Sequence, residues 1–162
     1  MSSLDASEVI AEHGMAYFQA MSTFGALSEG FIRDVLETGQ IEQLHKKDYI
    51  TRAGEPAEEF HVVLEGEVAY YRHGEGQDVL TRRFTRGEQM GFDLMLGLIP
   101  YEGTDVALQD SKVLTVSKTQ FYQLHVDHPQ EFGIFMINLA RELSREIEIL
   151  EDVISKGQGW QS

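Results

Sequence analysis

Residues 60–72 read FHVVLEGEVAYYR, and this stretch decides the fold class. Apolar side chains recur at every second position in Phe60, Val62 and Leu64, which is typical of a β-strand with at least one buried face. A second strongly β-forming run follows at once. Glu65-Gly66-Glu67 separates the two runs, and we expect it to reverse the chain between two strands.

A similar strand-like pattern extends on both sides of this stretch, from Ile41 to Val116. Short apolar runs alternate with glycines, mostly at the spacing of roughly eight to twelve residues that is typical of a β-sandwich or jelly roll. The pattern predicts strands near residues 41–44, 48–52, 60–64, 67–72, 78–84, 104–108 and 112–117.

Helical patterns lie on both sides of this β-region. Apolar residues recurring between Val9 and Met21 predict a moderately amphipathic helix that ends before Thr23. Ser28 is typical of an N-cap and Gly39 of a helix end, so we expect a short helix between them.

After the β-region, Ser117-Lys118-Thr119-Gln120 fits a capping box, in which the serine and glutamine side chains satisfy each other's amide donors. His128-Pro129 starts a further helix, because proline suits a first helical turn. This helix is expected to run from Pro129 to Lys156, about 40 Å. This helix carries an apolar seam with a nearly heptad repeat, formed by Phe132, Met136, Leu139, Leu143, Ile147, Leu150 and Ile154. Such a seam favours pairing with a second copy of the chain over packing on its own domain alone.

The segregation of helices and strands predicts an α+β fold: a β jelly roll (double-stranded β-helix) with N-terminal helices and a long C-terminal helix. Residues 1–22 are expected to form an N-terminal helical segment and residues 23–128 the jelly-roll domain. Residues 129–156 form the dimerisation helix, and residues 157–162 a tail.

The composition excludes several classes of protein. The 162 residues carry 27 Asp and Glu against 13 Lys and Arg, a net charge of −14, which argues against nucleic acid or an anionic membrane as a partner. Cysteine is absent, so there is no disulfide, thiolate nucleophile or cysteine-ligated metal. We expect a cytoplasmic protein, because no membrane-spanning or signal-like segment is visible either.

The order of these parts resembles the cyclic nucleotide-binding domain, most closely the effector domain of the catabolite activator protein family. The resemblance is carried by five segments: Tyr49–Ala57 (YITRAGEPA), Phe60–Val68, Arg86–Gly91 (RGEQMG), Ala107–Leu114 and His128-Pro129. It implies a regulatory module that senses a ligand and performs no chemistry. We expect no DNA-binding domain in this chain.

The resemblance also implies a ligand pocket, where the family uses a glutamate for the ribose hydroxyl and a later arginine for the cyclic phosphate. Here Gly91 is followed by Phe92 and Asp93, and no arginine occurs between Arg86 and Arg141. Without a guanidinium a cyclic phosphate lacks its charge-assisted donors, so we expect weak or no cyclic nucleotide binding and a preference for an uncharged or hydrophobic effector, or a protein partner. The pocket candidates are Phe84, Met90, Gly91, Phe92, Asp93, Leu94, Tyr101, Gly103 and Thr104.

Two alternatives stay open. The chain could be a genuine cyclic nucleotide-binding signalling protein, or a cupin-like jelly-roll metalloenzyme. The second lacks a His-x-His motif. His61 is alone on its strand, and Pro129 interrupts the helical face that His125, His128 and Glu131 would share. We expect no catalytic residue, metal or cofactor.

Overall fold

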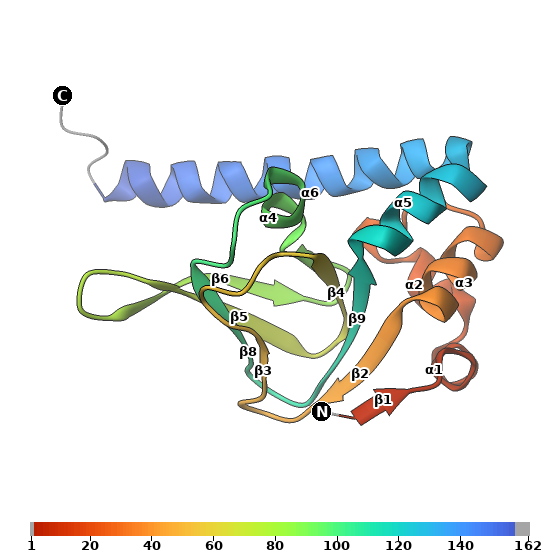
Figure 1. Ribbon diagram of the computed structural model, residues 1–162, viewed down its shortest axis with the longest axis horizontal. Coiled ribbons are helices and arrows are strands. Elements are labelled where there is room, and N and C mark those ends of the chain that lie inside the picture. The colour runs from red at the N-terminus through yellow and green to blue at the C-terminus, as the bar shows by residue number, and fades with distance from the viewer. Residues whose placement is uncertain (1, 158–162) are drawn as a thin grey trace.

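The computed structural model describes residues 2–157 and has two antiparallel β-sheets that face each other, with helices at one end and a long helix above them (Figure 1). One sheet has the strand order β1 (Ser2–Leu4), β2 (Gln40–Leu44), β9 (Ser111–Ser117), β4 (Glu59–Glu65) and β7 (Gln89–Met90). The other has the order β3 (Tyr49–Thr51), β8 (Gly103–Ala107), β5 (Glu67–His73) and β6 (Asp78–Thr85). The α+β class and the β-sandwich are confirmed.

Six α-helices and one 3₁₀ helix are present in residues 2–157: α1 (Ala6–His13), α2 (Met15–Gln19), η1 (Ser22–Phe24), α3 (Glu29–Thr38), α4 (Phe92–Gly97), α5 (Lys118–Asp127) and α6 (Pro129–Lys156). The long C-terminal helix is therefore confirmed. None of the helices in this part of the chain is long and apolar enough to cross a membrane.

The prediction of one helix between Val9 and Met21 is wrong. Gly14 interrupts the helix with φ 77° and ψ 151°, so that α1 and α2 are separate and η1 follows them. Strand β1, which the sequence analysis missed, pairs with β2 through only three residues. Its pattern is too short for periodicity to reveal.

The capping box at Ser117 is only half formed. Ser117 Oγ accepts a hydrogen bond from the Gln120 backbone N–H at 3.1 Å. The Gln120 side chain does not return to Ser117; it donates instead to Val35 O and Thr38 Oγ1 on α3. A tertiary contact has replaced the local one.

The turn at Gly66 differs from the expected reversal, because β4 and β5 belong to different sheets. Gly66 has φ 95°, and a Cβ there would lie 2.1 Å from Ser111 Oγ. The chain thus crosses from one sheet to the other at a corner that excludes any side chain. The tight reversal is the β5–β6 hairpin, where Gly74 N–H donates to Gln77 O.

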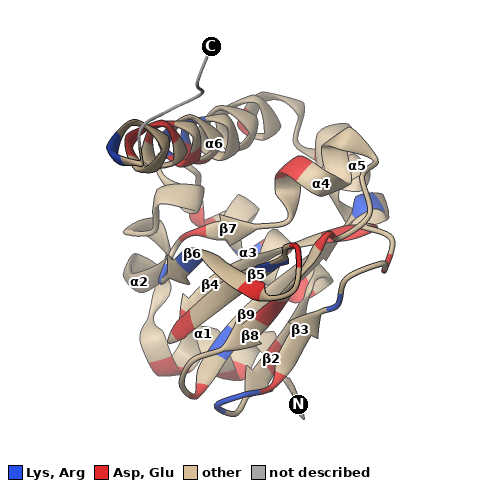
Figure 2. Ribbon diagram, turned by 90° about the vertical axis from the view of Figure 1, so that its left-hand side faces the viewer, with Lys and Arg blue, Asp and Glu red and all other residues tan. Residues whose placement is uncertain are grey.

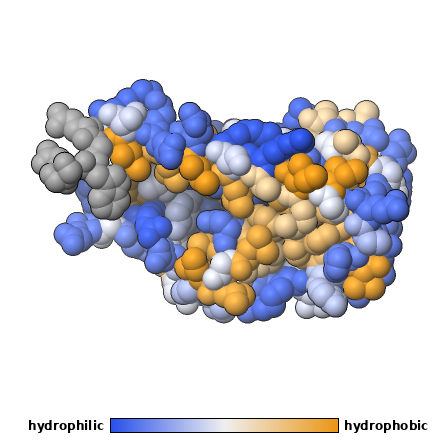
Figure 3. Space-filling model, turned by 90° about the horizontal axis from the view of Figure 1, so that it is seen from above, coloured by the Kyte–Doolittle hydropathy of each residue, from blue (hydrophilic) through white to orange (hydrophobic). Residues whose placement is uncertain are grey.

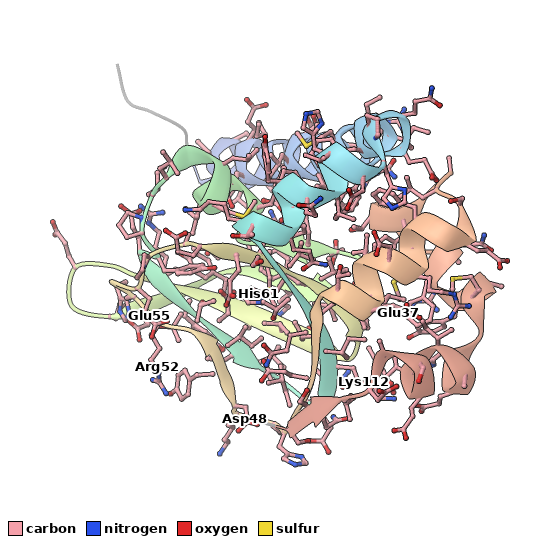
Figure 4. All side chains as sticks on the ribbon, turned by 45° about the vertical axis from the view of Figure 1, so that its right-hand side comes forward. Glu37, Asp48, Arg52, Glu55, His61 and Lys112 are labelled. Atoms are coloured by element: carbon pink, nitrogen blue, oxygen red, sulfur yellow. The ribbon has the colours of Figure 1, made fainter. Side chains whose placement is uncertain are left out.

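The apolar residues form two cores, one on each face of β4. Phe60, Val62 and Leu64 pack against the helices, whereas Val63 belongs to the smaller core between the sheets. His61 shares the face of Val63 and is 2% exposed (Figure 4).

Helix α6 is buried over its first half only. Phe135 and Leu139 are fully buried in the helix-side core, and partly buried Phe132, Met136 and Leu143 pack against it. These seam positions are therefore covered by the chain's own domain. The seam positions left open lie further along, Ile147, Leu150 and Ile154, and apolar surface runs along this part of the helix (Figure 3).

Replacing Gly66 by alanine should destabilise the fold by roughly 3 kcal/mol, because left-handed backbone strain adds to the clash with Ser111. Gly76→Ala is the matched control: φ is 87° there, but no atom lies within 4 Å of the added Cβ, so only about 1 kcal/mol of strain is expected. Chemical denaturation of both variants measures the difference. Equal losses would show that the corner at Gly66 tolerates a side chain.

Candidate functional site

A cavity of about 200 Å³ opens between the sandwich and α6, which passes above the strands in both ribbon views (Figures 1 and 2). Six elements and two further residues line it. The elements contribute Tyr70 and Arg72 of β5, Thr81, Arg82 and Phe84 of β6, Met90 of β7, Asp93 and Leu94 of α4, Asp105 of β8, and Glu146 and Leu150 of α6. The two further residues are Gly91, the N-cap of α4, and Tyr101.

Six of the nine residues proposed from the sequence lie in this lining: Phe84, Met90, Gly91, Asp93, Leu94 and Tyr101. Phe92 does not, because it points from α4 into the helix-side core and meets the rings of Phe60 and Phe121 edge to face. Gly103 and Thr104 do not line the cavity either. Gly103 packs against β5, where a Cβ would lie 2.3 Å from Tyr71 O, and Thr104 lies on the opposite face of β8 from Asp105.

Seven lining residues are not among the nine pocket candidates: Tyr70, Arg72, Thr81, Arg82, Asp105, Glu146 and Leu150. One signal was available. Arg82 and Phe84 are two positions apart on one strand and so share a face, and Phe84 was already a candidate. For Glu146 and Leu150 no local signal exists, because only the tertiary placement of α6 brings them to the cavity.

The expectation of a cavity without a guanidinium group is wrong, because β5 and β6 supply Arg72 and Arg82. Arg82 has a side chain that is only 12% exposed, and it lies over the Phe84 ring with Cζ 4.9 Å from the centroid. Its Nη1 is 3.0 Å from Glu146 Oε2. Arg72 forms an ion pair with Glu102 nearer the surface. Both guanidinium groups are therefore bound to carboxylates of the chain itself.

The Arg82–Glu146 pair joins the sandwich to α6. Gln89 Nε2 on β7 donates to the other carboxylate oxygen of Glu146 at 3.2 Å. Burial raises the pKa of Glu146 to about 7, and the neighbouring Arg82 only partly opposes this rise. The Gln89 side chain has a second contact, in which its Oε1 accepts the Phe92 backbone N–H at the start of α4. The Phe92 amide is therefore already hydrogen-bonded within the protein.

Two more carboxylates face the cavity without a cation bound to them in residues 2–157. Asp105 is 3% exposed, and burial raises its pKa to about 6, with the charge of Asp93 adding to the effect. Tyr101, beside them, donates its hydroxyl to Glu59 O at 3.2 Å, and burial raises the pKa of Tyr101 well above its usual range.

The histidines considered as metal ligands have other contacts. His61 Nδ1 lies 2.9 Å from Thr115 Oγ1, and burial lowers the pKa of His61 to about 4. His128 Nε2 lies 3.0 Å from Asp34 Oδ2, and Glu131 accepts the Ser28 backbone N–H. Within residues 2–157 no group of three or more His, Asp or Glu side chains is arranged to hold a metal ion.

Solved structures with the same fold are numerous, and all those compared below are under 25% identical to this chain. A cyclic nucleotide-binding domain from Methylobacillus flagellatus has 19% identity and a TM-score of 0.81, covering 96% of this chain and 88% of that one. The catabolite activator protein of Thermus thermophilus has 21% identity and a TM-score of 0.69, covering 83% of this chain and 63% of that one.

A third structure is the regulatory subunit of a cAMP-independent protein kinase A from Trypanosoma cruzi bound to guanosine. It has 19% identity and a TM-score of 0.70, covering 97% of this chain and 54% of that one. No curated protein matches the sequence. The family model described as "Cyclic nucleotide-binding domain" matches residues 41–128, which is more than half of the chain. With that match and the sandwich, cavity and long helix described above, the chain belongs to the cyclic nucleotide-binding domain family.

Proposed function

We propose that this chain is a non-enzymatic regulatory sensor whose cavity takes a small uncharged or largely apolar effector in preference to a cyclic nucleotide. The observation that carries the proposal is the state of the two guanidinium groups. Arg82 is paired with Glu146 and Arg72 with Glu102, so the charge of each is already offset by a carboxylate of the chain. The degenerate cassette at Gly91-Phe92-Asp93 points the same way.

Electrostatics favours this proposal over cyclic nucleotide binding. A cyclic phosphate at Arg82 would compete with Glu146 for the same positive charge, and if it displaced Glu146 that carboxylate would lose its cation in a largely buried place. Asp93 and Asp105 would add two further anions close to the ligand. The free energy of one phosphate–arginine contact has to offset all of these costs.

The rest of the lining suits an apolar molecule. Phe84, Met90, Leu94 and Leu150 present apolar side chains to the cavity. Its volume of about 200 Å³ lies below the range of roughly 300–1,000 Å³ for drug-sized ligands, which favours a small effector. The Trypanosoma cruzi relative, described as cAMP-independent and bound to guanosine, is a precedent for an uncharged ligand in this fold.

We propose further that the chain forms a homodimer through the second half of α6. The side chains of Ile147 and Val153 are 57% and 62% exposed, and Leu150 and Ile154 lie beside them. A row of exposed apolar side chains along one helix is the usual mark of a helix–helix contact. Since Leu150 also lines the cavity, the dimer contact and the effector would share one helical segment.

Titration calorimetry with cyclic AMP and cyclic GMP tests the effector proposal. We expect dissociation constants weaker than about 1 mM for the natural chain, corresponding to a binding free energy smaller than about 4 kcal/mol. Glu146→Gln removes the anion that holds Arg82, and should raise the affinity for cyclic AMP about tenfold or more. Glu148→Gln, an exposed position on the same helix, makes the same charge change and should have no effect. Micromolar binding to the natural chain would overturn the proposal in favour of a genuine cyclic nucleotide sensor.

Light scattering after gel filtration tests the dimer. The natural chain should have the mass of a dimer at micromolar concentration, and Ile147→Glu should shift it to a monomer, because the pair would bury two carboxylates. Leu80→Glu is the control, since Leu80 is exposed on the β5–β6 hairpin. A monomeric natural chain would contradict the prediction.

A further inference from the structure

Asp105 is the one side chain of the cavity lining with a buried polar atom that has no hydrogen-bond partner in residues 2–157. One carboxylate oxygen, Oδ2, accepts a hydrogen bond from Thr51 Oγ1. The other, Oδ1, is buried and has no partner anywhere in residues 2–157. A buried acceptor without a donor costs free energy, typically about 1–3 kcal/mol and more for a charged group. A ligand that supplies the donor would recover it.

The strands hold this carboxylate in place before any ligand arrives. Asp105 on β8 pairs in register with Thr51 on β3 and with Tyr70 on β5. The Asp105 backbone N–H donates to Thr51 Oγ1 at 3.3 Å. The Thr51 hydroxyl is therefore held by both the backbone and the side chain of Asp105. The orientation of the carboxylate is therefore set by two neighbouring strands, and little entropy is lost when it binds.

The charges around Asp105 select the kind of donor. Burial and, to a lesser extent, the charge of Asp93 on α4 raise the pKa of Asp105, and Tyr70 and Tyr101 are neutral near neutral pH. Glu146 on α6 is a third carboxylate of the lining. The two cations, Arg72 and Arg82, are bound to Glu102 and Glu146. The side of the cavity around Asp93 and Asp105 thus keeps an unbalanced negative charge, which attracts a cation and repels an anion.

We infer that Asp105 is an acceptor subsite that selects an effector with an N–H donor group, such as an amine or amidine, on a small apolar body. This inference rests on the proposed function, because it assumes that the cavity binds an effector. Of the two kinds of effector in that proposal it selects the largely apolar one rather than the uncharged one, and it names the polar group that this effector carries and the atom that receives it, Asp105 Oδ1.

Three planar probes of nearly the same shape test which group the cavity prefers. Benzamidine is a cation with N–H donors, benzamide is a neutral N–H donor, and benzoate is an anion without donors. Binding to the full chain would be followed by NMR titration of the backbone amides of Thr51 and Asp105. We expect benzamidine to bind more tightly than benzamide, and benzoate to bind most weakly. Equal or tighter binding of benzoate, or binding of none of the three, would overturn the inference.

Asp105→Asn keeps the shape of the side chain but turns an NH₂ group toward the cavity once the amide oxygen accepts from Thr51. Benzamidine affinity should fall about tenfold or more, the range of a charge-assisted hydrogen bond. Asp127→Asn, an exposed position on α5 that accepts from Gln123, is the matched control and should bind benzamidine like the natural chain. An unchanged affinity in Asp105→Asn would show that the subsite lies elsewhere.

A titration of the natural chain against pH needs no variant at position 105. Benzamidine affinity should weaken as the pH falls through about 6, because a protonated Asp105 no longer attracts a cation. Because Glu146 titrates nearby, the same pH titration is repeated with Glu146→Gln. The pH dependence of benzamidine affinity should persist in this variant if Asp105 is responsible, and loss of the pH dependence would contradict the inference. The cyclic AMP titration reports separately on the proposed function, since it depends on Arg82 and not on Asp105.

Discussion

The contact between Arg82 and Glu146 is the interaction on which the cavity depends. It joins the outer strand of one sheet to the middle of the long helix, and Gln89 adds a hydrogen bond from the other sheet. The apolar contacts of α6 belong to its first half, around Phe135 and Leu139. In the second half, as far as residue 157, the side-chain hydrogen bonds and ion pairs to the sandwich are those of Glu146 with Arg82 and Gln89.

That arrangement links the cavity to the outer surface of α6. Under the proposed function, an effector that contacts Arg82 or Glu146 would change the free energy of this contact, which lies next to the turns that carry Ile147, Leu150 and Val153. Under the proposed function, occupancy of the cavity and pairing of the helix are then coupled, and each must influence the other by the same amount. Helix α6 provides both surfaces, so no longer path through the sandwich is needed.

The sequence predicted the elements well where a local pattern was strong. Alternation in Phe60–Leu64, the cap at Ser28 and the proline start at Pro129 are read from neighbouring residues, and each is found in the structure. Contacts that depend on the tertiary fold were not predicted. Gln120 bonds to α3 instead of closing its own capping box, Gly66 joins two sheets, and Arg82 reaches the cavity from a hairpin outside the family's cassette. The prediction of a cavity free of arginine failed because it searched only the segment between Arg86 and Arg141.

Two acids of the cavity are buried at a cost to the stability of the fold. Burial raises the pKa of Asp105 to about 6 and that of Glu146 to about 7, so the native state binds more protons than the unfolded chain in the range from about pH 4 to 7. Stability contributed by these two groups therefore grows as the pH falls through that range and is lost as the pH rises to neutral. Uncharged residues of similar size would avoid that loss. Ionisable groups retained against the stability of the fold and gathered around one cavity are characteristic of a binding site rather than of a filled core.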